Sequence, residues 1–105
     1  MKWDIEFLDE AKKERDALDG SVRIQVYATI HKVSKNPVAK SEGGYGTPLG
    51  HKRGLNLTGL FKIKLLKLGI RIVYMLVKEG NKMKIVVIAA RADDEVYEIA
   101  SRRIK

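Results

Sequence analysis

Cysteine is absent from this chain of 105 residues, and proline occurs only twice. Without cysteine, neither a disulfide framework nor a Cys-ligated zinc site is available, which fits a reducing compartment. No apolar run approaches the roughly 20 residues that a membrane-spanning helix needs. The opening segment, MKWDIEFLDEAKKERD, is too charged to be a signal peptide. We therefore expect a cytoplasmic protein without a membrane partner, folded as a single domain over residues 1–105.

Acidic residues are scarce in the second half of the chain. Lys and Arg total 21 against 13 Asp and Glu, a net charge of 21 − 13 = +8. Residues 1–51 hold eight of each sign, whereas residues 52–105 hold thirteen basic and five acidic residues, so 13 − 5 = +8 and the whole excess lies there. A one-sided basic excess indicates a polyanionic partner. The alternative is that the charge serves solubility alone.

The N-terminal third predicts one strand and two helices. Apolar and polar side chains alternate strictly over residues 3–7, which favours a half-buried strand. Asp9 is expected to cap a helix that runs to about Leu18. A second helix is expected from Ser21 and must end before Pro37, because the residue preceding proline is pushed out of the helical region. The short connection predicts an antiparallel helical hairpin.

Residues 38–59 form the longest stretch without clear periodicity, and they hold six of the nine glycines. The glycines do not have the spacing of a phosphate-binding loop. We expect a basic, flexible surface loop, because long irregular segments in compact domains are usually functional or mobile. His51, Lys52 and Arg53, near its end, are candidate contacts to RNA.

The last part of the chain predicts three strands and a helix. Strand-like segments cover about 60–66, 70–77 and 83–91, and short hairpin-like connections join them. A helix is expected from Asp93, with acids in its first turn and basic residues in its last, matching the helix dipole. The resulting order, β-α-α-β-β-β-α, is an α+β fold with a small, mostly antiparallel sheet.

Cations occupy sheet positions where neutral polar residues are usual. Alternation over residues 61–65 places Lys62 and Lys64 on one face, about two residues' rise or roughly 7 Å apart. A two-residue turn would set Arg71 opposite Lys64, whereas a three-residue turn would direct it to the other face. Arg91 follows the last apolar run, and the one acid in residues 60–92 is Glu79.

Like charges that face one another across a sheet are destabilising by up to about 1 kcal/mol per pair. A sequence that keeps them therefore indicates either a solvated face or a site for an anion. The near absence of a balancing acid favours the anion site. Neither histidine has ligand spacing for a metal, and many carboxylates lie near the N-terminus, so no metal ion or other cofactor is expected.

The segments FKIKLLKLGIRIVYMLV and VVIAARADDEVYEIASRRI closely resemble the RelE branch of the RelE/ParE toxins of bacterial toxin–antitoxin systems. The opening WDIEFLDEAKKERDALD and the helix ending in SKNP fit the same family, so the resemblance covers nearly the whole chain. The glycine-rich stretch 38–59 departs from the family pattern. The family's cluster of basic residues and a tyrosine falls on Lys62, Lys64, Arg71, Arg91 and Tyr97.

The resemblance implies a ribosome-dependent endoribonuclease that cleaves mRNA in the ribosomal A site without metal. The RNA 2′-hydroxyl would attack the adjacent phosphate. Lys64 is the candidate base, because neighbouring cations favour its neutral form, and Lys62 and Arg71 would hold the phosphate. Arg91 would face the leaving oxygen, as a source of charge stabilisation or as an acid. Tyr97 would stack on a base or orient the attacking group.

The resemblance also implies partners. A cognate antitoxin would bind the protein, and promoter DNA would be reached only through that complex, since no helix resembles a recognition helix. Lys67, Lys82 and Lys84 join the candidate contacts to RNA and the ribosome. Two alternatives remain open. A ParE-like gyrase poison would not need the cationic cluster, and a non-catalytic RNA-binding module would not need the placement of Arg91 and Tyr97.

Overall fold

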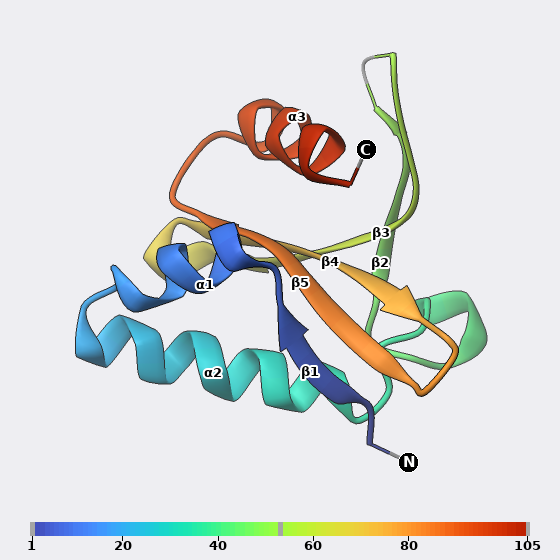
Figure 1. Cartoon of the computed structure of the whole chain (residues 1–105), viewed down its shortest axis with the longest axis horizontal. Helices are drawn as coiled ribbons and strands as arrows, with labels where there is room; N and C mark the ends of the chain where they lie inside the picture. The colour runs from blue at the N-terminus through green and yellow to red at the C-terminus, as the bar shows by residue number, and fades with distance from the viewer. Residues whose placement is uncertain (1, 53, 105) are drawn as a thin grey trace.

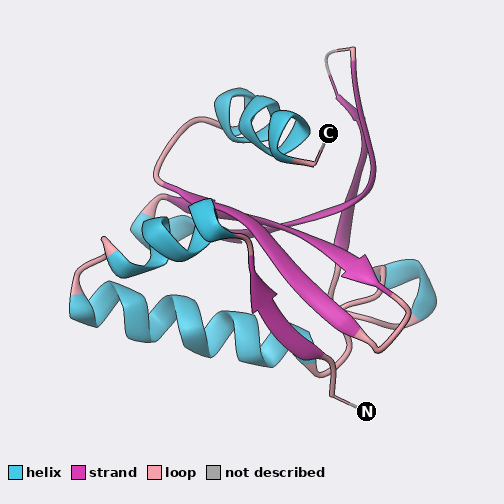
Figure 2. Cartoon of the chain, in the orientation of Figure 1, coloured by secondary structure: helices cyan, strands magenta, loops and turns pink. Residues whose placement is uncertain are grey.

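The computed structural model describes residues 2–52 and 54–104. Its elements follow one another as β1 (Asp4–Phe7), α1 (Asp9–Asp16), α2 (Gly20–Ser34), the short 3₁₀ helix η1 (Lys40–Glu42), β2 (Thr47–Lys52), β3 (Leu55–Leu65), the 3₁₀ helix η2 (Leu66–Leu68), β4 (Ile70–Val77), β5 (Lys82–Ala89) and α3 (Asp93–Arg103). The predicted α+β class is confirmed, with one additional strand, β2 (Figure 2). No helix within the described residues is long and apolar enough to cross a membrane.

The strands form one sheet in the order β1-β5-β4-β3-β2. β1 pairs with β5 in parallel, and the other neighbouring pairs are antiparallel. Helices α1 and α2 lie against one face of the sheet, and α3 lies against the other (Figure 1). The sheet is therefore covered on both faces, and the two coverings come from opposite ends of the chain.

Each face of the sheet has its own apolar core. In β4, Ile72 and Tyr74 pack on the same side as Ile30 of α2. Val73, between them, belongs to the opposite core together with Val96 of α3. Successive strand residues point to opposite faces, so a strand that is apolar at nearly every position can serve both layers.

One extra residue interrupts the regular pairing of β5. The pairing with β4 passes from Ile85 directly to Val87, which leaves Val86 as the extra residue of a β-bulge. Val86 and Val87 both belong to the core beneath α3, whereas Ile85 and Ile88 belong to the other core. The strand ends at Ala89, two residues before the predicted end at about residue 91, because the chain turns there to begin α3.

The expected cap of the first helix was wrong by one residue. Leu8 is the N-cap of α1, and Asp9 is the first helical residue. The Leu8 N–H donates to the Ile85 carbonyl (3.0 Å), and the Leu8 carbonyl accepts from the Lys12 N–H (2.8 Å). Leu8 thus both continues the contact with β5 and begins the helix, while Asp9 lies in the first turn, where negative charge is favourable.

The segment 38–59 is not the flexible loop that its glycines suggested. A compact turn, in which the Tyr45 N–H donates to the Asn36 carbonyl (2.8 Å), leads into a β-hairpin made of β2 and β3. Gly43 and Gly54 have φ angles of 85° and 80°, in the left-handed region that favours glycine. These glycines therefore form tight turns.

Tyr74 connects this turn to the sheet. Its buried hydroxyl donates to the Pro37 carbonyl (2.8 Å), and burial raises the pKa of Tyr74 far above its usual value. Gly46 lies against the same two groups. A Cβ atom at this position would be 2.6 Å from the Pro37 carbonyl oxygen and 2.7 Å from the Tyr74 hydroxyl. The close approach excludes any side chain larger than hydrogen.

We expect Gly46→Ala to lower the free energy of unfolding by about 2–3 kcal/mol, because the added methyl group forces the turn away from Tyr74. Gly20→Ala is the control. A Cβ at Gly20 would meet nothing within 4 Å, and Gly20 is the first residue of α2, so stability should be unchanged or slightly higher. Urea denaturation of both variants measures the difference. Equal midpoints for the two variants would contradict the prediction.

The C-terminal end of α3 is attached to α1 and β5 by one arginine. Arg103 donates to both carboxylate oxygens of Glu14 (2.8 and 3.1 Å) and to the carbonyl of Val86 (2.9 Å). Glu14 also accepts a hydrogen bond from the Ile88 N–H (3.1 Å). The pairing of β1 with β5 ends at Ile85, so Ile88 lies past the part of β5 that β1 covers. Charge-assisted hydrogen bonds of this kind fix geometry as well as adding stability. They hold α3 over the sheet face that carries the predicted cations.

Candidate active site

The β3–β4 hairpin determines which of the predicted residues meet. Lys64 pairs directly with Arg71 across the two strands. The connection between them contains η2 and ends at Gly69, whose φ of 66° is left-handed. The sequence left two registers open, and the structure has the one that sets Arg71 opposite Lys64. The connecting turn is longer than two residues, but like a two-residue turn it leaves Lys64 and Arg71 directed to the same face of the sheet.

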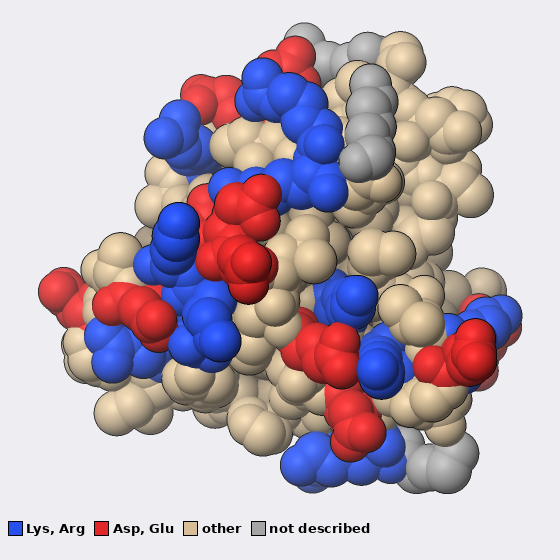
Figure 3. All heavy atoms as spheres, viewed as in Figure 1, with Lys and Arg blue, Asp and Glu red and all other residues tan. Residues whose placement is uncertain are grey.

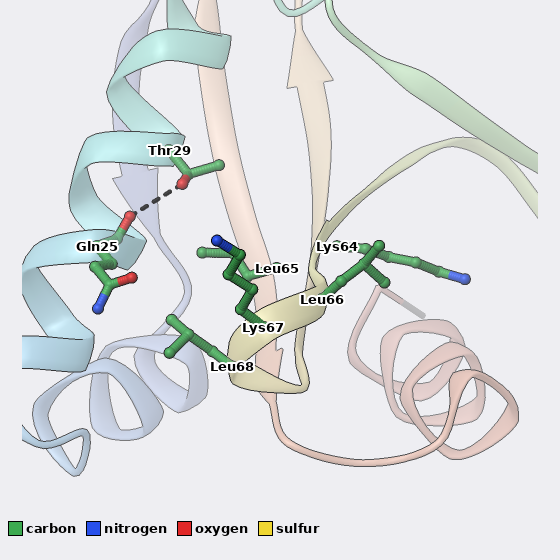
Figure 4. Close-up of a pocket in the computed structure, with 7 residues that line it drawn as sticks. All are labelled: Gln25, Thr29, Lys64, Leu65, Leu66, Lys67 and Leu68. Atoms are coloured by element: carbon green, nitrogen blue, oxygen red, sulfur yellow. Dashed lines mark hydrogen bonds between the residues drawn. The ribbon is translucent and has the colours of Figure 1, made fainter.

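The paired cations lie on the face of the sheet that α3 covers. Residues 61, 63 and 65 belong to the core beneath α2, so the alternate residues, Lys62 and Lys64, face the other way. Figure 4 shows Lys64 extending away from Gln25 and Thr29 of α2, whereas Lys67 and Leu68 extend toward that helix. At this end of the hairpin, Lys64 therefore lies on the side away from α2, and Lys67 and Leu68 lie on the α2 side.

Asp93, the first residue of α3, lies between the two facing cations. Its carboxylate accepts from the Lys64 ammonium (2.8 Å) through one oxygen and from the Arg71 Nε–H through the other. The three side chains are 28–34% exposed. The hydrogen bond from Lys64 is the main reason that the pKa of Asp93 lies below its usual value, and the bond from Arg71 adds to it against the effect of partial burial.

The expectation of a cluster without a balancing acid was therefore wrong. Asp93 lies just beyond the range 60–92 that contains only Glu79, and its position at a helix start already had a sufficient local explanation in the helix dipole. The turn after β5 brings it back to Arg71, which pairs with Ala89 at the end of that strand. Only the pairing of β4 with β5 could have indicated this contact.

Tyr97 lies one turn after Asp93 and is only 5% exposed. Burial raises the pKa of Tyr97, the charge of Asp93 adds to the rise, and the charges of Lys64 and Arg71 oppose it. The tyrosine is thus close enough to all three groups to sense their charges. Its burial leaves little ring surface for stacking on a base.

Arg91 contributes to the cluster with its backbone. Its carbonyl accepts from Nη1 of Arg71 (3.0 Å), while its own guanidinium pairs with Glu95 (3.2 Å) and is 61% exposed. Lys62 stands two residues before Lys64 on the same face, beside Val73 of β4. The structure therefore brings Lys64, Arg71 and Tyr97 together and places the side chain of Arg91 at the rim.

The other predicted RNA contacts are dispersed. His51 pairs with Asn56 near the end of the β2–β3 hairpin, eight residues along β3 from Lys64, or about 26 Å. Lys67 extends toward α2, on the opposite side from the cluster. The side chain of Lys52 and the whole of Arg53 lie outside the described residues.

Lys82 and Lys84 lie at the far end of the sheet from the cluster. Lys84 is five residues from Ala89, the partner of Arg71, which corresponds to about 16 Å along β5. Lys82 forms an ion pair with Glu6 of β1 (3.3 Å). Figure 3 shows Lys and Arg interspersed with Asp and Glu over the viewed face. The basic excess of the second half is thus partly offset in space by acids of the first half.

The described part of the chain contains no ready site for a metal ion. Residues 2–52 and 54–104 contain no group of three or more His, Asp or Glu side chains arranged to hold a metal ion. What the cluster offers is two cations about one strand spacing apart, a carboxylate between them and a phenol hydroxyl beside them. The two cations are donors of the kind that bind a phosphate, and the lysine and the phenol are groups that can exchange a proton near it.

Comparison with known proteins gives relatives across the full length, although no family model matches the chain. A curated Escherichia coli protein described as a RelE-like toxin is 29% identical over 105 residues, which is all of both chains. The free-state structure of an E. coli RelE toxin mutant, in which two arginines are alanine, is 27% identical over all of both chains, with a TM-score of 0.76. The toxin in the intact E. coli RelBE toxin–antitoxin complex shares the fold, with 23% identity, a TM-score of 0.66 and coverage of 86% of this chain and 98% of that one.

Proposed function

This chain is RelE-like in sequence and in fold, and from that premise we propose that it is the toxin of a type II toxin–antitoxin system. We propose further that it cleaves mRNA in the A site of the ribosome, without a metal ion, and thereby stops translation. The observation that carries this proposal is the pairing of Lys64 with Arg71 beside Tyr97. These are three of the five residues on which the resemblance places the reaction.

The proposed reaction uses the nucleophile that RNA carries. The 2′-hydroxyl oxygen attacks the adjacent phosphorus, the P–O5′ bond breaks, and the products are a 2′,3′-cyclic phosphate and a 5′-hydroxyl. One proton must leave the 2′-oxygen, and one must reach the 5′-oxygen. Between these events the phosphate carries extra negative charge, which Lys62 and Arg71 are suited to stabilise.

Lys64 is the proposed base, and its contact with Asp93 sets a condition on that role. An ammonium group in an ion pair with a carboxylate holds the proton that a base must lack. Lys64 can therefore accept a proton only after Asp93 has moved away, and while the pair persists it acts as a cation. Arg91 is suited to stabilise the leaving oxygen from the rim by its charge.

An antitoxin is the proposed partner. The E. coli RelBE structure contains a toxin with this fold together with its antitoxin. We propose that a cognate antitoxin covers part of this chain and neutralises it, and that promoter DNA is contacted by the antitoxin. The ribosome, through its RNA and the mRNA in the A site, is the proposed target.

Brief expression of this chain alone in bacteria should stop growth, and primer extension should then reveal new 5′ ends within translated mRNA. Co-expression of a cognate antitoxin should restore growth, because a bound antitoxin would exclude the toxin from the ribosome. The Lys64→Ala variant, checked for folding by circular dichroism, is the control. Harmless high-level expression of the folded chain without any partner would contradict the proposed function.

A further inference from the structure

Two cations of the proposed site, the candidate base Lys64 and the phosphate-binding Arg71, already bind an anion of the protein itself. Lys64 and Arg71 each donate to a different oxygen of Asp93. A carboxylate placed between a lysine and an arginine accepts from their N–H groups. The two non-bridging oxygens of an RNA phosphate would use the same N–H donors. The carboxylate and a phosphate cannot occupy these donors together, because two anions in contact repel each other strongly.

We propose that Asp93 is a built-in competitor of the substrate phosphate, which occupies the Lys64–Arg71 clamp until RNA displaces it. This inference rests on the proposed function, since it names how the same site is regulated. Displacement requires that Asp93 leave both donors, and its side chain, 34% exposed, borders solvent into which it can turn. Ion pairs with this degree of exposure contribute little stability, so they are exchangeable.

The location of Asp93 also keeps it in place without RNA. It is the first residue of α3, where the helix dipole favours a negative charge. The far end of α3 is held by the bonds of Arg103 to Glu14. Binding of a free RNA therefore replaces one well-placed anion in the clamp with another, so the net gain in binding free energy is small. An mRNA that the ribosome already holds in register would meet the clamp at high effective concentration and displace the carboxylate.

The test measures binding of a short 2′-O-methyl oligoribonucleotide, which cannot be cleaved, by fluorescence anisotropy. Asp93→Asn keeps the size of the side chain and removes its charge. Glu98→Gln is the matched control, because it removes one negative charge from the same helix, five residues on and so roughly 140° around the helix axis. We expect Asp93→Asn to tighten binding about tenfold and Glu98→Gln to change it by less than about twofold.

Two further measurements make the result specific. Adding Arg71→Ala to Asp93→Asn should abolish the gain, because the clamp is then incomplete. Inorganic phosphate should raise the melting temperature of Asp93→Asn more than that of the unmodified protein, which also shows that the variant folds. Equal binding by Asp93→Asn and Glu98→Gln, weaker binding by Asp93→Asn, or a gain that survives Arg71→Ala would each overturn the competitor role.

Failure of this inference is separable from failure of the proposed function. Cleavage by the unmodified protein on programmed ribosomes is measured alongside binding. If the protein cleaves there but Asp93→Asn gains no affinity, only the competitor role is lost. If the protein does not cleave on ribosomes, the proposed function fails and the competitor role, as a control on RNA cleavage, fails with it.

Discussion

Lys64→Ala is expected to reduce cleavage on programmed ribosomes by about a hundred- to a thousand-fold, because one preorganised charge at a reacting phosphate stabilises the transition state by about 3–4 kcal/mol. Arg91→Ala should also abolish most cleavage if its guanidinium faces the leaving oxygen. The measurement is the cleavage rate of each variant on ribosomes that carry a defined mRNA. Thermal melts of the same preparations establish whether each variant is folded.

The controls separate a single site from bulk charge. Lys84→Ala removes the same charge about 16 Å along β5 from the cluster, and Lys78→Ala removes it from the β4–β5 connection. Both should weaken ribosome binding at most, in a salt-dependent way. Equal losses from all three lysines would mean that total charge is what matters. Full toxicity with the cluster removed would instead favour a gyrase poison of the ParE kind.

The structure also changes the expected stability of Lys64→Ala. From the sequence, removal of one cation from a crowded face should leave folding unharmed or slightly improved. Asp93, however, lies between the cations and accepts a hydrogen bond from Lys64. We now expect a small loss, up to about 1 kcal/mol, because the variant removes one partner of a partly exposed ion pair.

Free mRNA should be cut poorly or not at all by concentrations of the protein that cleave the same mRNA on the ribosome. The cluster contains no histidine, and its lysine is paired with Asp93, so it lacks a ready base. The ribosome must then supply much of the alignment of the 2′-hydroxyl with the phosphate, and orientation alone is worth several orders of magnitude in rate.

Parallel time courses with free and ribosome-bound mRNA measure this difference. A catalytic amount of unmodified protein is compared with Lys64→Ala, so that contaminating ribonuclease is recognised as cleavage that the variant retains. Rapid cutting of free mRNA at many sites by the unmodified protein, lost in the variant, would contradict the prediction. It would identify a free-standing ribonuclease that needs no ribosome.

The elements predicted most accurately are those in which local signals agree. β4 covers residues 70–77 as predicted, because a β-branched and aromatic run lies between Gly69 and the turn at Gly80. The alternation in β3 correctly placed Lys62 and Lys64 on the same face. The register of Arg71 could only be narrowed to two possibilities, since the geometry of the four connecting residues was unknown.

The features that the sequence did not predict depend on the place of an element in the sheet. β2 has the sequence TPLGHK, and proline and glycine are both unfavourable in strands. β2 is an outer strand of the sheet, and an outer strand tolerates Pro48, because one of its edges needs no N–H donor. The contact of Asp93 with Arg71 likewise depends on a pairing between strands that no local pattern specifies.

The bulge in β5 has a mechanical consequence for the cluster. Arg103 bonds to the carbonyl of the bulged residue, Val86, and so anchors one end of a rigid rod of eleven residues. Asp93 and Tyr97 lie on the same helix, and Asp93, at its N-terminal end, is about 15 Å from the anchor. A small rotation about the anchor becomes a larger displacement at Asp93. The reach of the carboxylate into the clamp is thus set partly by a backbone irregularity at the other end of α3.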